Sequence, residues 1–351
     1  NVATGRAGGV AAPLDVLPKG HGVRGVSTYV SADGTIKGQW VKTRSNDDQL
    51  RQAWLEQAIA ELPTWVPVAD PVPMPHLDQG ADILAVIPWG DPHLGMRAWI
   101  EECGDNFDLK IAEDLYGAAF DAIARRGTPA RTALLINVGD ALHADDSTER
   151  TPRGKHPLDV DGRHPLIVRV AVRVFVRAIR SLLGAHERVI VDMLAGNHDP
   201  HSAHWLAAAI EGYFTEEPRG EIIHPVEACH FHEWGDCLIG TTHGDEVRNP
   251  AELPGIMASQ ARQQWGAAKF CHFWVGHLHH KWAIQSKDYQ GVTVEHVRTL
   301  AARDAYAARK GYSSPRDIWR IAYHKHFGEI DRFRVSEEYL RTAYLERRGA
   351  A

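Results

Sequence analysis

The feature that most restricts the fold of this sequence is a series of short apolar runs, each followed at once by a polar cluster. Five such runs lie at 83–87, 133–138, 188–194, 237–241 and 273–275. Further β-prone runs follow at 292–297, 318–324 and 330–335, and segments with helical spacing lie at 109–126 and 166–183. Short apolar runs that alternate with helices are typical of an α/β domain. Because ligands bind beyond the carboxyl ends of strands in such sheets, we expect the five clusters to form one site.

The clusters carry the residue types that bind divalent metals. They read Asp91-Pro92-His93, Gly139-Asp140-Ala141-Leu142-His143, Gly196-Asn197-His198-Asp199, Thr242-His243-Gly244-Asp245 and Gly276-His277-Leu278-His279. Carboxylate and imidazole ligands suit Mn, Fe, Zn or Ni, and an Asp can bridge two ions. Two ions about 3.5–4 Å apart can activate a water and stabilise charge on the attacking and leaving oxygens of a phosphate ester. Glycines before Asp140, Asn197 and His277 would let the backbone turn tightly beside the ions.

In this order the clusters resemble the signature of the calcineurin-like metallophosphoesterase superfamily, which is D-x-H, G-D, G-N-H-D/E, a lone H and then G-H-x-H. The match covers residues 91–279, about half of the chain. The resemblance implies a four-layer α/β/β/α sandwich of two mixed sheets covered by helices. The segments GNHDPHSAHW and VRTLAARDAY also resemble phage-encoded metallophosphoesterases.

The resemblance also implies a role for each residue. Asp91, His93 and His279 would bind the first ion, Asn197, His243 and His277 would bind the second, and Asp140 would bridge them. His198 would be the catalytic histidine outside the ligand set, and Asp199 would orient its imidazole. His243 is preferred as the lone histidine over His224, His230 and His232, because it directly follows the run CLIGTT.

His143, three residues after Asp140, resembles the double-strand-break-repair nuclease branch, whereas serine/threonine phosphatases have a second Asp in this region. We therefore predict hydrolysis of a phosphodiester by a metal-bridging hydroxide, with His198 and His143 acting on the leaving group. The two divalent transition-metal ions are expected to be Mn, with Fe, Zn or Ni as alternatives. The phosphodiester substrate is left open between a small molecule and nucleic acid.

Three other functions remain open. A DNA exo- or endonuclease is favoured by His143 and by a basic stripe on the predicted helix 166–183, but a formal net charge of −6 opposes it. A phosphomonoesterase would use the same metals. A non-catalytic assembly component of a phage particle would not need the full set of polar residues. The stripe consists of Arg169, Arg173, Arg177 and Arg180, for which a solvated face or subunit contact is favoured.

Outside this region the sequence predicts a disordered leader at 1–20, a small appendage at 21–80 and the metallophosphoesterase domain at 81–340. The appendage would contain a β-hairpin around Asp33-Gly34, a helix at 47–62 and a Pro-rich linker. No signal peptide or membrane span is evident, so we expect a cytoplasmic protein with no membrane partner, and homo-oligomer formation stays open. The four cysteines lack metal-site spacing and are expected to be buried thiols.

Several other residues adjoin the clusters. His201, His204 and His280 could line a pocket, although helix capping or support of the ligands fits them at least as well. Core packing is favoured for Trp89 and Trp282, with stacking on a substrate as the alternative. Residues 144–164 form a long polar loop that would help to define substrate access.

Overall fold

The computed structural model describes residues 21–31, 33–45, 72–247, 249–278 and 286–345, which belong to two compact units divided after Glu61. The first unit contains the predicted hairpin, in which β1 (His21–Val30) pairs antiparallel with β2 (Ile36–Ser45). At its turn Gly34 has a φ of 84°, and the Asp33 carboxylate accepts a hydrogen bond from the Thr35 amide at 3.0 Å. The predicted helix at 47–62 lies outside the described residues.

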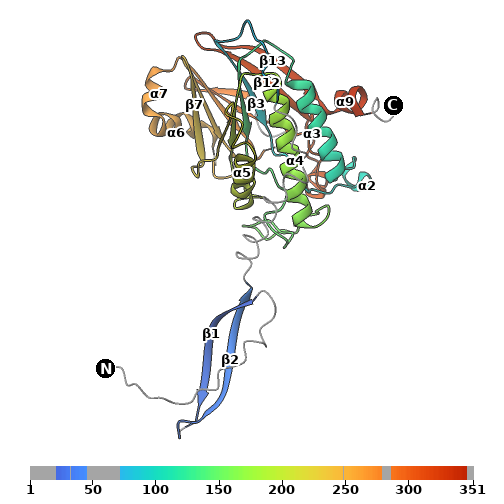
Figure 1. Cartoon of the computed structure of the whole chain (residues 1–351), viewed down its shortest axis with the longest axis vertical. Helices are drawn as coiled ribbons and strands as arrows, with labels where there is room; N and C mark the ends of the chain where they lie inside the picture. The colour runs from blue at the N-terminus through green and yellow to red at the C-terminus, as the bar shows by residue number, and fades with distance from the viewer. Residues whose placement is uncertain (1–20, 32, 46–71, 248, 279–285, 346–351) are drawn as a thin grey trace. The chain divides into compact units, whose positions relative to one another are not determined.

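The second unit contains two mixed sheets (Figure 1). The six-stranded sheet has the order β13-β12-β3-β4-β5-β6, and its strands β3 to β6 are parallel. In chain order these strands are β3 (Ile83–Trp89), β4 (Thr132–Asn137), β5 (Arg188–Met193), β6 (Gly220–Ile223), β12 (Asp317–His324) and β13 (Gly328–Ser336). The five-stranded sheet has the order β10-β11-β9-β8-β7. Its strands are β7 (Cys229–Trp234), β8 (Cys237–Thr242), β9 (Phe270–Val275), β10 (Ser286–Tyr289) and β11 (Val292–His296).

Helices cover the outer face of each sheet. The longer ones are α3 (Leu109–Ile123), α4 (His164–Leu183), α5 (Ser202–Tyr213) and α6 (Leu253–Gln260). Short helices complete the unit: α2 (Ile100–Cys103), η2 (Pro250–Glu252), α7 (Arg262–Ala267), α8 (Ala305–Arg309), α9 (Glu337–Leu340) and η3 (Arg341–Leu345). The rings of Trp89, Tyr116, Phe120 and Phe175 meet where β3 packs against α3 and α4. Trp89 is therefore a core residue, as favoured from the sequence.

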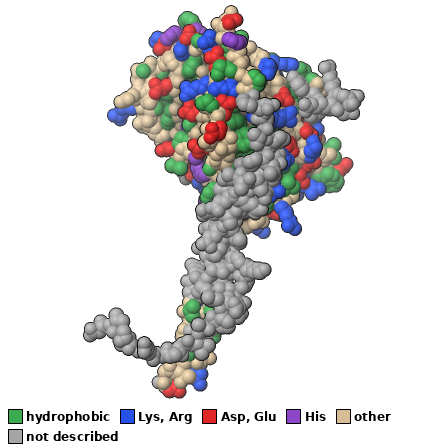
Figure 2. Space-filling model, viewed as in Figure 1, with side chains coloured by type: hydrophobic (Ala, Val, Ile, Leu, Met, Phe, Trp, Pro, Cys, Tyr) green, Lys and Arg blue, Asp and Glu red, His purple; other side chains and the backbone are tan. Residues whose placement is uncertain are grey.

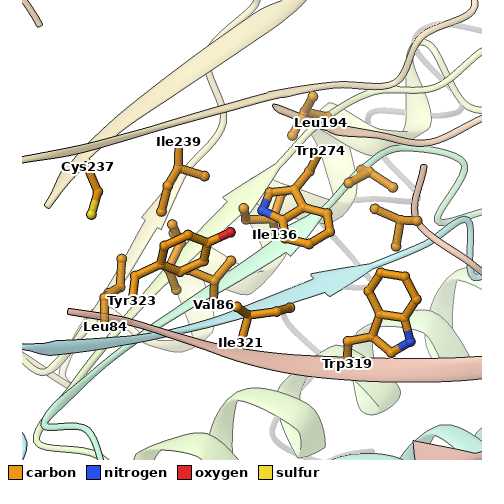
Figure 3. Packing of buried hydrophobic residues seen from close by; sticks show 13 residues of the cluster. Leu84, Val86, Ile136, Leu194, Cys237, Ile239, Trp274, Trp319, Ile321 and Tyr323 are labelled. Atoms are coloured by element: carbon orange, nitrogen blue, oxygen red, sulfur yellow. The ribbon is translucent and has the colours of Figure 1, made fainter. Parts of the chain in front are cut away.

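The inner faces of the sheets pack against each other. Figure 3 shows Val86, Ile136 and Ile321 from one sheet facing Ile239 and Trp274 from the other. A second apolar cluster joins β8, β9 and β11 to α6. The result is the four-layer α/β/β/α sandwich that the sequence predicted. Among the described residues, no helix has both the length and the apolar character needed to cross a bilayer.

Three strands were not predicted, namely β6, β7 and β10. In β7 (CHFHEW) the inward side chains include histidines rather than aliphatic residues, because a buried carboxylate lies opposite them. His230 Nδ1 and His232 Nε2 lie 2.5 and 2.7 Å from the Asp192 carboxylate on β5. This contact joins the two sheets, and it places His230 and His232 outside the cluster around His243.

The cysteine prediction is largely confirmed: Cys103, Cys229 and Cys237 are buried thiols, and Cys271 is partly buried.

The Asp192 contact predicts a pH-dependent contribution to stability. Burial opposes both charges, yet the partners raise the pKa of His230 above 6.5 and lower the pKa of Asp192 below 3.8. The stability that His230 contributes is fully present below the pKa of His230 in the unfolded chain, and it is lost as the pH rises through its pKa in the folded chain. The stability that Asp192 contributes is fully present above the pKa of Asp192 in the unfolded chain, and it is lost as the pH falls through its pKa in the folded chain. Asp192→Asn should therefore cost most between about pH 4 and 6.5, about 3 kcal/mol.

Urea unfolding of the metal-free protein across pH 4–9 measures this effect. The control is Asp236→Asn, which removes a partly exposed carboxylate paired with Lys269 and His326 and should cost far less stability. A cost for Asp192→Asn that is constant over this range would contradict the assignment.

Candidate metal centre

The predicted ligands meet where strands of both sheets end. Asp91 and His93 follow β3, Asp140 follows β4, and Asn197 follows β5. In the other sheet, His243 directly follows β8, and His277 follows β9 after one glycine. Asp91, His93, Asp140 and His243 are buried, whereas Asn197 and His277 are partly buried. His279 lies outside the described residues, so its predicted role as a ligand stays a prediction.

Two groups of possible ligands share one carboxylate. Asp91, His93 and Asp140 form one group, Asp140, His243 and His277 form the other, and within each group the ligand atoms lie within 4.8 Å of one another. Asn197 adjoins the second group, since its Oδ1 lies 2.9 Å from His243 Nε2. Asp140 thus belongs to both groups, and its predicted role as a bridging ligand stays a prediction.

Hydrogen bonding fixes which nitrogen of His243 faces this group. Nδ1 lies 2.9 Å from the Val138 carbonyl, which can only accept, so Nδ1 carries a proton. Nε2 therefore faces Asp140 Oδ2 at 3.4 Å. A carbonyl that orients the far nitrogen of an imidazole is the usual support of a histidine ligand.

The electrostatics of this cluster favour a cation. Burial opposes the charged form of His243, but the Asp140 and Asp91 carboxylates raise its pKa to about 10. Burial likewise opposes ionisation of Asp140, and His243, His198 and His93 hold the pKa of Asp140 well below its ordinary value. In the metal-free chain, a proton on His243 balances part of the negative charge of the Asp140 and Asp91 carboxylates. Divalent ions would supply this positive charge in the metal-loaded protein. The oxygen and nitrogen donors fit such ions.

The backbone is strained at the same positions. Among the described residues, seven other than glycine have positive φ, and four of these belong to the cluster: Asp91 at 28°, His93 at 46°, Asp140 at 50° and His277 at 65°. Such conformations cost about 1–3 kcal/mol each and concentrate at functional sites. The packing of the two sheets stabilises them here.

The three glycines act in two ways. Gly139 has a φ of 102°, as a tight turn requires. Gly196 and Gly276 instead permit close approach, because a Cβ at Gly196 would collide with Asp140 and a Cβ at Gly276 with Asp91 and Val138. The prediction of tight turns is therefore confirmed at Gly139, while absence of a side chain is what matters at the other two.

His93, His143 and His198 form a third group of nitrogens close enough to bind an ion. His198 Nδ1 donates to the His143 carbonyl at 2.8 Å, which leaves Nε2 as the nitrogen available to a ligand. Burial, assisted by His198, lowers the pKa of His143 to about 3, so this imidazole is neutral near pH 7. We favour the two groups that contain carboxylates, because carboxylates offset the charge of a divalent ion.

Asp199 does not orient His198, so that prediction is wrong. Its buried carboxylate accepts hydrogen bonds from the Leu142 and Gly196 amides, both at 2.9 Å. Burial and the neighbouring Asp140 raise the pKa of Asp199 to about 7. Asp199 thus joins the loops that follow β4 and β5, and the carbonyl of His143 takes the predicted place beside His198.

Other supporting residues were not predicted. Asp145, the second carboxylate of GDALHAD, is buried and accepts from the amides of His201 and Ser202 where α5 begins. His201 Nδ1 also contacts Asp145 at 2.7 Å, so His201 supports this helix start rather than the ligand cluster. Tyr116 donates to the Pro92 carbonyl and Thr299 donates to the Asp91 carbonyl. In the sequence, only the second acidic residue of GDALHAD and the helix-capping role considered for His201 signalled any of these contacts.

Two arginines of the basic stripe form ion pairs with a neighbouring helix. On α4, Arg173 forms two hydrogen bonds with Glu113 at 2.8 and 2.9 Å, and Arg177 pairs with Asp121 at 2.6 Å. Both acidic residues belong to α3. Contact between helices, rather than a nucleic-acid groove, accounts for these two arginines. Trp282 and His280 lie outside the described residues.

Comparison with known proteins found no matching family model and no matching curated protein. Solved structures with a similar arrangement include a predicted phosphoesterase from Streptococcus pneumoniae (12% identity, 73% of this chain and 91% of that chain, TM-score 0.30). Vps29 from Entamoeba histolytica is also similar (12% identity, 72% of this chain and 98% of that chain, TM-score 0.31). So is a purple acid phosphatase from yellow lupin, Lupinus luteus (10% identity, 75% of this chain and 55% of that chain, TM-score 0.29). These likenesses are weak, and the assignment of the metal centre rests on its own residues.

The close approach at Gly196 generates a prediction. Gly196→Ala should displace the Asp140 carboxylate and weaken Mn²⁺ binding at least tenfold, while the protein remains folded. Gly212→Ala is the matched control, because a Cβ at this helical position meets nothing within 4 Å. Calorimetric titration with Mn²⁺, alongside circular dichroism, measures both properties; equal Mn²⁺ affinity in the two variants would contradict the role given to Gly196.

Proposed function

We propose that this chain is a calcineurin-like metallophosphoesterase that hydrolyses phosphodiesters with two divalent transition-metal ions, Mn being the favoured metal. The observation that carries the proposal is the position of Asp140, which belongs to two adjacent groups of ligands. One shared carboxylate between two groups of donors is the arrangement that a dinuclear centre needs.

The residues divide as follows. Asp91 and His93, with His279 as predicted, would hold one ion, and Asn197, His243 and His277 would hold the other, with Asp140 common to both. When bound, such ions lower the pKa of a water and stabilise negative charge on phosphoryl oxygens. The burial of Asp91, Asp140 and His243 limits water around the reacting groups, which strengthens their electrostatic effect.

His198 is suited to move a proton. Its Nδ1–H is held by the His143 carbonyl, so Nε2 is the nitrogen that can bind a phosphoryl oxygen or give a proton to the departing alcohol. The ring of His143 stacks beside that of His198, with centroids 5.2 Å apart. We assign the proton transfer to His198, which lines the neighbouring cavity, while the buried His143 packs against its ring.

A diester is favoured over a monoester by the charges beside the centre. A terminal phosphate carries two negative charges, and its recognition calls for cationic side chains. Two guanidiniums line the neighbouring cavity, but Arg303 donates to the Cys103 and Tyr312 carbonyls, and Arg316 donates to Leu300 and Asp105. Both guanidiniums already donate hydrogen bonds to groups of the protein, which supports a substrate whose phosphate carries a single negative charge.

A nuclease is the second candidate, favoured by His143. The surface charge opposes a long polyanion: Figure 2 shows acidic and basic side chains interspersed over the visible face of the second unit. Beside His243, Asp245 and Glu246 both pair with Arg153. A DNA strand that crosses the centre would meet these carboxylates.

A panel of substrates separates the candidates. The Mn-loaded protein should hydrolyse an aryl phosphodiester at least tenfold faster than an aryl phosphomonoester, and should act slowly on single- or double-stranded DNA. Turnover of the monoester alone would exclude the phosphodiesterase. An inactive protein with two bound metals would favour the non-catalytic alternative.

The role of His198 is tested by His198→Asn. Loss of general acid catalysis should lower kcat by about 10²–10⁴, with two Mn²⁺ still bound. The control, His326→Asn, changes an exposed histidine in the turn between β12 and β13 and should leave kcat unchanged. Near-normal turnover by His198→Asn would remove this residue from the mechanism.

A further inference from the structure

A cavity of about 310 Å³ opens beside the metal centre. His93, Asp140, His198 and His277 line part of it, and most of its other lining residues come from the segment 299–316, which includes α8. This segment lies outside the motif that predicted the metal centre. The volume is at the lower end of the 300–1,000 Å³ typical of small-molecule sites, so the cavity suits one compact organic group.

The wall away from the ligands is largely apolar and aromatic. Met96, Ala301, Ala302 and Ala307 contribute small or unbranched apolar surfaces, and Tyr306 and Tyr312 contribute rings. The two tyrosine ring centroids are 6.4 Å apart, with their planes at 67°. Tyr306 is 63% exposed, and although Lys310 Nζ lies 5.8 Å from its ring centroid, part of the ring surface remains open for stacking. Ser313 and Ser314 add hydroxyls that can bind the polar edge of a ring.

The wall is braced against the metal centre. Thr299 Oγ1 donates to the Asp91 carbonyl at 2.8 Å, and Arg316 donates twice to the Leu300 carbonyl. Arg303 reaches the Cys103 carbonyl at 2.8 Å, and Asp304 caps α8 through the Ala307 amide at 2.7 Å. A wall held by such contacts is formed before the ligand binds, which lowers the entropic cost of binding.

A second cavity, of about 420 Å³, adjoins the centre at Asn197 and His243 and has a different character. Asn197 and His243 line it together with Glu227, Asp245 and Glu246. Its guanidinium, from Arg153, pairs with the last two carboxylates. An anionic chain would be repelled on this side, whereas a neutral alcohol portion of a diester would not.

We infer that the 310 Å³ cavity binds the aromatic base of a nucleoside esterified to the phosphate, so that the substrate class is a small nucleoside phosphodiester rather than a nucleic-acid strand. This inference rests on the proposed function for the position of the phosphate at the metals. The aromatic wall recognises the base, the ligand side holds the phosphate, and the acidic second cavity excludes a continuing polyanion.

Binding of a hydrolysis product tests the cavity without turnover. Calorimetry on Mn-loaded protein should show that thymidine 5′-monophosphate binds at least tenfold more tightly than methyl phosphate, since stacking of a base on an aromatic side chain contributes about a tenfold effect or more. Ala307→Trp, which fills the cavity, should abolish this preference. The matched control Val226→Trp adds the same ring to the lining of the second cavity and should retain the preference for the nucleotide over methyl phosphate. Tyr306→Ala, at an exposed ring, should reduce nucleotide affinity severalfold and leave methyl phosphate affinity unchanged.

Equal affinity for the two ligands in the unmodified protein, or a preference that survives Ala307→Trp, would overturn the inference. Faster cleavage per bond of single-stranded DNA than of a dinucleotide would also overturn it. Turnover of an aryl diester is measured in parallel. Turnover without nucleotide preference would refute the cavity assignment alone, whereas nucleotide preference without turnover would refute the proposed function alone.

Discussion

The Asp140 carboxylate is the interaction on which the site depends. Its Oδ1 accepts a hydrogen bond from the His198 amide at 2.8 Å, and its Oδ2 lies 3.4 Å from His243 Nε2. The Asp140 carbonyl accepts from the His93 amide at 2.9 Å, and Gly196 packs directly on the carboxylate. One residue therefore fixes the loops that follow β3, β4, β5 and β8, and it unites the two groups of ligands.

This arrangement is costly for the protein. Asp91, Asp140 and Asp199 are all buried within the same cluster, and burial together with repulsion from Asp140 raises the pKa of Asp199 to about 7. Four strained backbone positions add to the cost. The close packing of the two sheets, visible around Trp274 in Figure 3, supplies the compensating stability. A bound divalent cation would relieve the repulsion, which is why the cluster is best understood as a metal centre.

Much of this could be predicted from the sequence, because the candidate metal ligands follow apolar strands with fixed spacing. The helices α3 and α4 and eight strands of the second unit, from β3 to β13, were located, since their apolar periodicity is uninterrupted. The strand β7 was missed because His230 and His232 interrupt its alternation, and their partner Asp192 is distant in sequence.

The contacts of individual side chains were harder to predict. Asp199 adjoins His198 in the chain, yet its carboxylate accepts hydrogen bonds from the amides of Leu142 and Gly196. The folded loops bring these two donors to the carboxylate. Tyr312 belonged to no motif, and Tyr306 ended the segment VRTLAARDAY, whose resemblance to phage-encoded metallophosphoesterases gave it no position, so their place beside the metal centre was visible only in the structure.

The central claim is that Asp140 bridges two metal ions. Anomalous diffraction from crystals of the protein grown with Mn²⁺ tests it most directly. Two peaks about 3.5–4 Å apart, with the Asp140 carboxylate between them, are the predicted result. A single peak, or an ion held by His93, His143 and His198 without Asp140, would contradict the account.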